Sequence, residues 1–102
     1  MTSDQKIQEI SMMEQNLQNL LLQKQAFQME LSETLAAKRE IDSAGEDVFK
    51  IIGQLMIKTD KEKVKKELEN KEKLLGIRIN SFEKQESIFL EKIESLRSEI
   101  IG

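Results

Sequence analysis

The sequence predicts a mostly α chain: an antiparallel two-helix coiled coil with one central β-hairpin. Two polar stretches of nearly equal length carry apolar residues at heptad spacing, and a short island of β-type composition separates them. The chain has no proline, tryptophan or tyrosine and only four phenylalanines, which favours long uninterrupted helices over a compact globular core. We expect a single arm, residues 1–102, whose helices fold back on each other with both termini at one end.

The first helix is expected over residues 3–43. Its apolar residues are spaced alternately by three and four positions, which keeps one stripe facing a partner helix. Lys24, Thr34 and Lys38 interrupt this stripe, and Gly45 stands where a glycine could terminate the helix. The apolar members of the stripe are Ile10, Met13, Leu17, Leu20, Phe27, Leu31 and Ile41.

The β-hairpin is expected over residues 47–59, with strands at 48–52 and 55–59. Gly53 and Gln54 lie between them, and glycine at the first central position suits a type II′ turn. An isolated two-stranded hairpin is marginally stable, and this one is apolar on both faces, so we expect other subunits to bury it. One face would carry Phe49, Ile51 and Met56, and the other Val48, Ile52, Leu55 and Ile57.

The second helix is expected over residues 60–101. Thr59 and Glu62 have the spacing of a capping box at its start. Glu72 and Glu86 interrupt its heptad stripe, and Gly76, inside the helix, marks either a soft point or a close approach of another backbone. The apolar members of the stripe are Leu68, Leu75, Ile79, Phe82, Phe89, Ile93, Leu96 and Ile100.

The pairing of the two helices can be estimated from their equal rise per residue. If residue 43 lies opposite residue 60, Leu75 faces Phe27 and Phe82 faces the leucines at 20–22. Leu96 then lies against Ile7, and Ile100 and Ile101 have no apolar partner. The apolar residues at this free end are compatible with a frayed terminus or with a binding surface. As candidate binding residues we take Ile7, Met12, Ile88, Ile100 and Ile101.

Composition argues against several classes of function. The net charge of −3 argues against bulk attraction to nucleic acid or to anionic membranes. Between residues 58 and 73, seven lysines alternate with five acidic residues, as on a solvated helix face. The chain has neither cysteine nor histidine, and its glutamates are expected to be solvated ion-pair partners. We therefore expect no enzyme, no catalytic residue, no cofactor, no metal site and no transmembrane span, and a cytoplasmic protein.

A family resemblance comes from the hairpin and the helix that follows it. Residues 48–63, VFKIIGQLMIKTDKEK, resemble the hairpin-to-helix stretch of prefoldin β-type subunits, especially archaeal ones. The stretches QKQ at 23–25 and EKQE at 83–86 are also similar. An α-type subunit would carry two hairpins, and this chain has room for one.

The resemblance implies a hetero-hexamer of two α and four β subunits, whose hairpins assemble into an intersubunit β-barrel. It implies an ATP-independent chaperone, or holdase, that binds non-native polypeptides at the coiled-coil tips and delivers them to a group II chaperonin. The expected partners are an α-type prefoldin subunit, other β copies, non-native polypeptides and the chaperonin, without nucleic acid or membrane. The alternative is a structural coiled-coil adaptor or tether that binds one folded partner.

Overall fold

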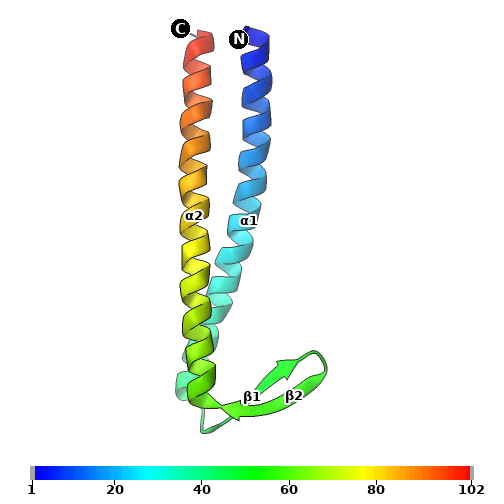
Figure 1. Cartoon of the computed structure of the whole chain (residues 1–102), viewed down its shortest axis with the longest axis vertical. Helices are drawn as coiled ribbons and strands as arrows, with labels where there is room; N and C mark the ends of the chain where they lie inside the picture. Colours follow the sequence, from blue (N-terminus) through cyan, green and yellow to red (C-terminus); the bar gives the residue numbers. More distant parts are fainter. Residues whose placement is uncertain (1, 102) are drawn as a thin grey trace. The chain divides into compact units, whose positions relative to one another are not determined.

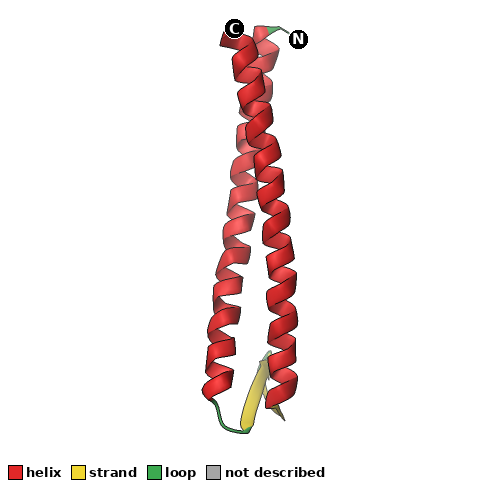
Figure 2. Cartoon of the chain, turned by 90° about the vertical axis from the view of Figure 1, so that its left-hand side faces the viewer, coloured by secondary structure: helices red, strands yellow, loops and turns green. Residues whose placement is uncertain are grey.

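The computed structural model describes residues 2–101 and confirms the predicted fold class. Helix α1 (Ser3–Ser43) is followed by strands β1 (Asp47–Ile52) and β2 (Leu55–Asp60) and by helix α2 (Lys61–Ile101) (Figure 1). The chain divides into two compact units. Unit 1 comprises Met1–Phe27 and Arg78–Gly102, and unit 2 comprises Gln28–Ile77. Each unit contains one segment of each helix. Figure 2 shows the helices in red and the two strands in yellow.

The heptad seam lies where the sequence places it. Every apolar position predicted for the two stripes is buried or half-buried, whereas the positions beside them are mostly exposed. In unit 1 the most buried side chains are Ile10, Leu20, Ile79 and Ile93, and in unit 2 Leu75 is buried. The alternating three- and four-residue spacing therefore packs as a coiled-coil seam in both units.

The polar interruptions of the two stripes pair with each other. In unit 1 the Lys24 ammonium lies 3.0 Å from a Glu86 carboxylate oxygen, and in unit 2 Lys38 lies 2.8 Å from Glu72. The hydrogen bond to Glu72 raises the pKa of Lys38 above its ordinary value. Thr34 is 3% exposed, and its hydroxyl donates to the Glu30 carbonyl at 2.8 Å. These three polar groups of the seam thus each have a partner, which offsets the cost of removing them from water.

The helices pair in a different register from the one predicted. The rings of Phe27 and Phe82 lie 5.4 Å apart between centroids, and the Arg78 guanidinium lies 5.2 Å from the Phe27 centroid. The predictions that Phe82 faces the leucines at 20–22 and that Leu75 faces Phe27 are therefore wrong. The prediction assumed that the helix ends at the hairpin lie level, but the polar pairs set the register. Lys24 and Lys38 are spaced along α1 as Glu72 and Glu86 are along α2.

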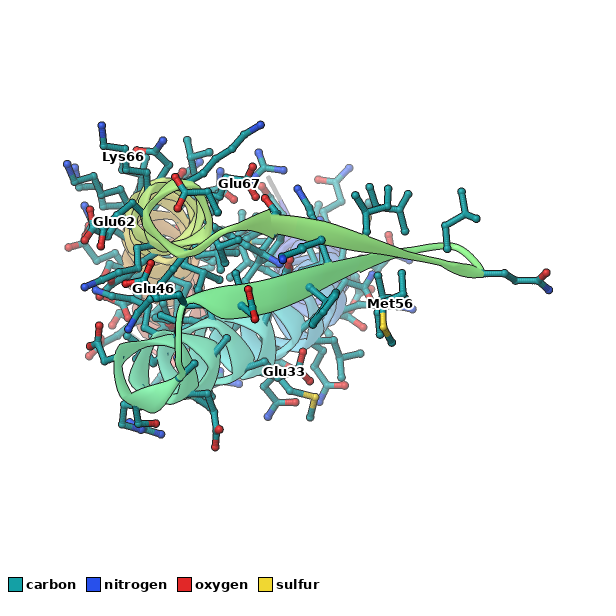
Figure 3. The ribbon with its side chains drawn as sticks, turned by 90° about the horizontal axis from the view of Figure 1, so that it is seen from below. Glu33, Glu46, Met56, Glu62, Lys66 and Glu67 are labelled. Carbon is teal, nitrogen blue, oxygen red and sulfur yellow. The ribbon has the colours of Figure 1, made fainter. Side chains whose placement is uncertain are left out.

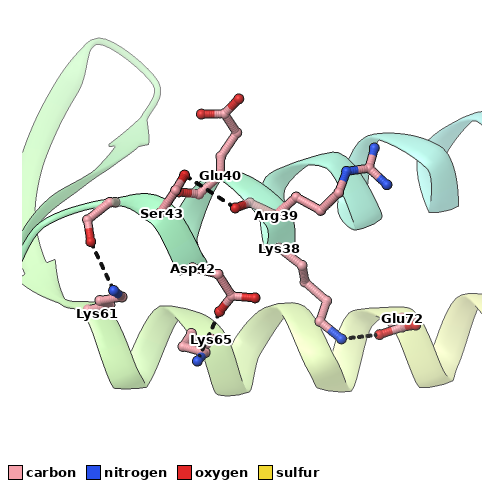
Figure 4. Close-up of polar contacts among 9 residues, drawn as sticks. Lys38, Arg39, Glu40, Asp42, Ser43, Lys61, Lys65 and Glu72 are labelled. Atoms are coloured by element: carbon pink, nitrogen blue, oxygen red, sulfur yellow. Dashed lines mark hydrogen bonds and ion pairs between the residues drawn. The ribbon is translucent and has the colours of Figure 1, made fainter.

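Side chains, not a glycine, complete the end of α1. Helix α1 ends at Ser43, and among the described residues only Gly53 has a positive φ, so Gly45 does not adopt the left-handed conformation in which glycine commonly ends a helix. The Ser43 hydroxyl donates to the Glu40 carbonyl at 3.1 Å, and the Lys61 ammonium donates to the Ala44 carbonyl at 2.9 Å (Figure 4). These donors satisfy carbonyls that the helix leaves without an internal partner.

An ion pair also joins the two helices beside this end. Lys65 lies 3.0 Å from Asp42 (Figure 4). Its hydrogen bond to Asp42 lowers the pKa of that carboxyl and raises the pKa of the Lys65 ammonium.

The cap of α2 lies one residue later than predicted. Thr59 belongs to strand β2, where it pairs with Val48, so its proposed role as the N-cap is wrong. The Asp60 carboxylate instead accepts a hydrogen bond from the Glu62 backbone N–H at 3.4 Å. The strand continues to Asp60 because the ladder with β1 extends to Asp47, and α2 begins at Lys61 rather than at residue 60.

A substitution at Gly76 tests how much this glycine lowers the stability of α2. A Cβ added there would meet no atom within 4 Å, so the structure does not support a close approach of backbone within the chain. Gly76→Ala should raise the free energy of unfolding by about 0.5–1 kcal/mol, because alanine loses less backbone freedom in a helix. Urea unfolding followed by circular dichroism measures the change. Gly53→Ala, at φ +61°, is the matched control and should destabilise. A destabilised Gly76→Ala chain would contradict the prediction.

The Phe27–Phe82 contact tests the corrected register. Phe82→Ala should cost about 2–4 kcal/mol, toward the low end for buried phenylalanine, because the ring is only half-buried. In a double-mutant cycle, Phe27→Ala and Phe82→Ala should show a coupling of about 0.5–1.5 kcal/mol. The same cycle between Phe82 and the exposed Leu22 should show none. Coupling to Leu22 and not to Phe27 would restore the original register.

Candidate functional site

The first candidate surface is the hairpin of unit 2. Residue pairing along the hairpin is Ile52 with Leu55, Ile51 with Met56, and Lys50 with Ile57. Gly53 has φ +61° and Gln54 is not in the left-handed region, as a type II′ turn requires. The predicted strand pairing, position of the turn and alternation of faces are thus confirmed, and each strand is one residue longer than predicted.

Apolar side chains are exposed on both faces of this hairpin. Ile51 is 71% exposed and Met56 68%, on the face that also carries Phe49. The opposite face exposes Ile52, Leu55 and Ile57. Figure 3 shows the two strands extending away from the helices of unit 2, with Met56 on the extended part. Six apolar side chains on a two-stranded sheet have no core of their own.

Val48 differs from the other hairpin residues predicted to contact partner subunits. It is only 8% exposed, and it lines a hollow of about 550 Å³ with Ile41, Val64 and Leu68 of the helices. Lys50 adds a second attachment, since its ammonium lies 2.9 Å from Glu67 of α2, and the hydrogen bond lowers the pKa of the Glu67 carboxyl. Val48 and Lys50 therefore fix the base of the hairpin, and the remaining six residues form the surface open to a partner.

The second candidate surface is a groove in unit 1, where the start of α1 and the end of α2 lie side by side (Figure 1). It has a volume of about 350 Å³ and is lined by Ile7, Ile10, Arg97, Ile100 and Ile101. Ile101 is 86% exposed and Ile7 54%. Three of the five predicted binding residues, Ile7, Ile100 and Ile101, therefore come together here.

The groove also corrects the prediction for Ile100. The shifted register brings it beside Ile7 and Ile10, where it is half-buried, so the expectation that it lacks an apolar partner is wrong. Leu96, expected against Ile7, instead lines a second hollow together with Met13. The register that brings Phe82 to Phe27 also brings these later residues of α2 to the start of α1.

Met12 and Ile88 do not line the groove. Both are exposed, at 67% and 51%, but Ile88 precedes Ile100 by about three helical turns, or about 18 Å at 1.5 Å per residue. Met12 lies off the seam, next to the seam residue Met13. They remain isolated exposed side chains, which are common on protein surfaces.

Two residues of the groove, Ile10 and Arg97, were not predicted from the sequence. Ile10 was assigned wholly to the seam, whereas it is buried at the floor of the groove. Arg97 is charged, and its guanidinium is paired with Glu14 of α1. The signal that could have found both is the equal spacing of the polar interruptions, because it fixes which residues of α1 face the end of α2.

Other chemistry is not apparent in the part of the chain that the structure describes. No three histidine, cysteine or acidic side chains among residues 2–101 gather closely enough to hold a metal ion. Within the same range, neither helix has an apolar stretch long enough to cross a membrane.

The order helix, hairpin, helix, with a heptad seam in both units, defines a coiled-coil protein with a single inserted hairpin. A family model described as "Prefoldin subunit" matches residues 4–102. The chain therefore belongs to the prefoldin family of chaperone subunits.

The similar proteins are β subunits of prefoldin from archaea. The chain is 39% identical to prefoldin subunit beta of Thermococcus onnurineus over 89 residues, covering 85% of this chain and 77% of that relative. It is 33% identical to the subunit of Sulfurisphaera tokodaii over 93 residues, covering 89% and 74%. The crystal structure of the prefoldin beta subunit from Thermococcus strain KS-1 matches with a TM-score of 0.91 at 35% identity, covering 96% and 88%. The predicted resemblance to an archaeal-like β-type subunit is confirmed.

Proposed function

We propose that this chain is the β-type subunit of an ATP-independent holdase. It assembles through its hairpin into a hetero-hexamer of two α-type and four β-type prefoldin subunits. It holds non-native polypeptides at the coiled-coil tip, in the groove of unit 1, and delivers them to a group II chaperonin in the cytoplasm. Membership of the prefoldin family supports this function, and the exposed hairpin is the observation that carries it.

The hairpin supports assembly because it exposes more apolar surface than a two-stranded sheet on its own can stabilise. Phe49, Ile51, Ile52, Leu55, Met56 and Ile57 are each between 44% and 71% exposed. Burying one such side chain completely contributes about 1.5–3 kcal/mol. The two strands also leave two open edges, and unpaired edge groups are normally covered by another strand. An intersubunit β-barrel would cover both faces and both edges.

The groove of unit 1 supports client binding for a different reason. Its lining is aliphatic except for Arg97, which Glu14 neutralises, so it offers contacts without a strict hydrogen-bonding requirement. Non-native chains expose apolar segments of no fixed shape, and such a groove can accept many of them. One groove buries little area and binds weakly, but several on one platform raise the affinity by effective concentration, by about 10²–10⁴-fold.

The hairpin is tested by introducing charge at its open faces. Replacing Ile51 and Ile57 with Asp would bury unpaired carboxylates on opposite faces, at a cost of several kcal/mol each while they stay ionised. The assembly formed with an α-type prefoldin subunit should dissociate while helix content largely persists. Sedimentation velocity and circular dichroism measure the two outcomes.

The matched control for the hairpin variant is Leu74→Asp with Ile77→Asp. These side chains are as exposed as those of the hairpin but lie on α2 of the same unit. This control should leave the mass of the assembly unchanged. An Ile51→Asp/Ile57→Asp chain that keeps its full mass would show that the hairpin does not drive assembly.

The tip is tested by removing residues 1–8 together with residues 95–102. This deletion removes Ile7, Arg97, Ile100 and Ile101 and leaves unit 2, with the hairpin, complete. The truncated chain should still assemble but should lose suppression of aggregation for several unrelated denatured proteins, measured by light scattering without nucleotide. Protection equal to that of the full chain would place client binding elsewhere. A chain that protects no denatured protein, but binds one folded partner, would be the tether.

A further inference from the structure

In the two segments that form the groove of unit 1, carboxylates outnumber basic groups. Segments 1–14 and 91–102 contain six acidic side chains and three basic ones. Two of the three basic groups are held across the seam, because Lys6 lies 3.5 Å from Glu99 and Arg97 is paired with Glu14. Four carboxylates form no ion pair with any residue in the range 2–101: Asp4, Glu9, Glu91 and Glu94.

An uncompensated negative charge lies on the same helix face as the groove. Among residues 2–101, Arg97 is the one charged residue that lines the groove, and Glu14 neutralises it. Glu94 precedes Arg97 by three residues and Ile101 by seven, so it lies on the same helix face as both. The second hollow of unit 1, by contrast, is lined by charges of both signs, with Lys92 beside Glu9 and Glu99. An apolar groove with an acidic surrounding can therefore discriminate between ligands by their charge.

We propose that the groove prefers non-native segments in which an aliphatic side chain is flanked by lysine or arginine. The aliphatic side chain packs against Ile7, Ile100 and Ile101, and the flanking cations lie in the field of the unpaired carboxylates. This preference rests on the proposed function and specifies the class of client. At distances near the Debye length, each uncompensated carboxylate changes the ratio of the affinities for a lysine-flanked and a glutamate-flanked segment by about twofold, so a surplus of three gives about five- to tenfold at low salt.

Three peptides test this preference. Each carries the same two-leucine core, flanked by lysines, by glutamines or by glutamates, and a fluorescent label. Anisotropy titrations with the full-length assembled protein give the three affinities. At about 50 mM salt the lysine peptide should bind about five- to tenfold more tightly than the glutamate peptide, with the glutamine peptide between them. At about 0.5 M salt the three affinities should converge, because screening shortens the range of the field.

Two sets of charge-neutralising substitutions locate the effect. Replacing Asp4 with Asn and Glu9, Glu91 and Glu94 with Gln should abolish the preference for the lysine peptide, because the one uncompensated charge then left in these segments is that of Lys92. The glutamine peptide's affinity should be unchanged. The matched control removes the same charge from unit 2 and should retain the preference: Glu33→Gln, Glu40→Gln, Glu46→Gln and Glu69→Gln. Ile7→Gln with Ile101→Gln should weaken all three peptides by the same factor.

The possible outcomes separate this inference from the proposed function. If the glutamine peptide binds and the lysine and glutamate peptides bind equally at low salt, the charge preference is overturned and client holding stands. If the preference survives neutralisation of the four carboxylates, it originates elsewhere and the inference is again overturned. If no peptide binds in the groove, as judged by the Ile7→Gln/Ile101→Gln chain, the proposed tip site fails and the preference with it.

Discussion

A seam between only two helices is the constraint on which the rest of this structure depends. Two helices enclose a single row of contacts, and even the most buried side chains, Thr34 and Ile93, keep 3% and 4% of their exposure. Such a half-open seam tolerates Lys24 and Lys38, provided that Glu86 and Glu72 lie opposite them. Apolar side chains alone accept several registers of a heptad repeat at similar cost, whereas a half-buried lysine accepts only those with a carboxylate opposite. The polar pairs therefore select the register that the apolar residues then fill.

The same constraint explains why the hairpin remains exposed. The helices of unit 2 are engaged with each other through the seam, and Val48 is the one strand side chain that they bury. Lys50 reaches Glu67 and fixes the direction in which the strands leave α2. Beyond these two attachments the alternation of β1 and β2 places apolar side chains on two faces that no part of unit 2 covers. The hairpin is thus ordered by its ladder and by its base, not by a core.

The features that depend on residues close together in the sequence could be predicted from the sequence. The alternation from Phe49 to Ile57, with glycine at the turn, determines both strands, their pairing and their faces, because cross-strand pairing follows from the turn. The boundary between β2 and α2 was predicted less well, because Thr59 could either cap α2 or extend the strand. In the structure it pairs with Val48 and extends the strand. The helix register was missed because it is a property of two segments far apart in the sequence. Ile10 and Arg97 of the groove were missed for the same reason. Ile7, Ile100 and Ile101 were predicted because the estimated register places these apolar residues at the free end, and they line the groove although that register is wrong.

The hairpin and the groove of unit 1 differ in the hydrogen bonds that a ligand must make with them. The hairpin presents open backbone edges as well as apolar faces, so a ligand must satisfy N–H and C=O groups at fixed spacing, which only another strand does well. The groove of unit 1 presents aliphatic side chains and one neutralised guanidinium, so it has no polar group of its own that a ligand must satisfy, whatever the ligand's backbone conformation. A surface of the first kind discriminates strongly between partners, and one of the second kind discriminates weakly, by apolar area and by charge. Under the proposed function, one chain can therefore assemble specifically and hold clients broadly, because the two tasks use surfaces with different hydrogen-bonding requirements.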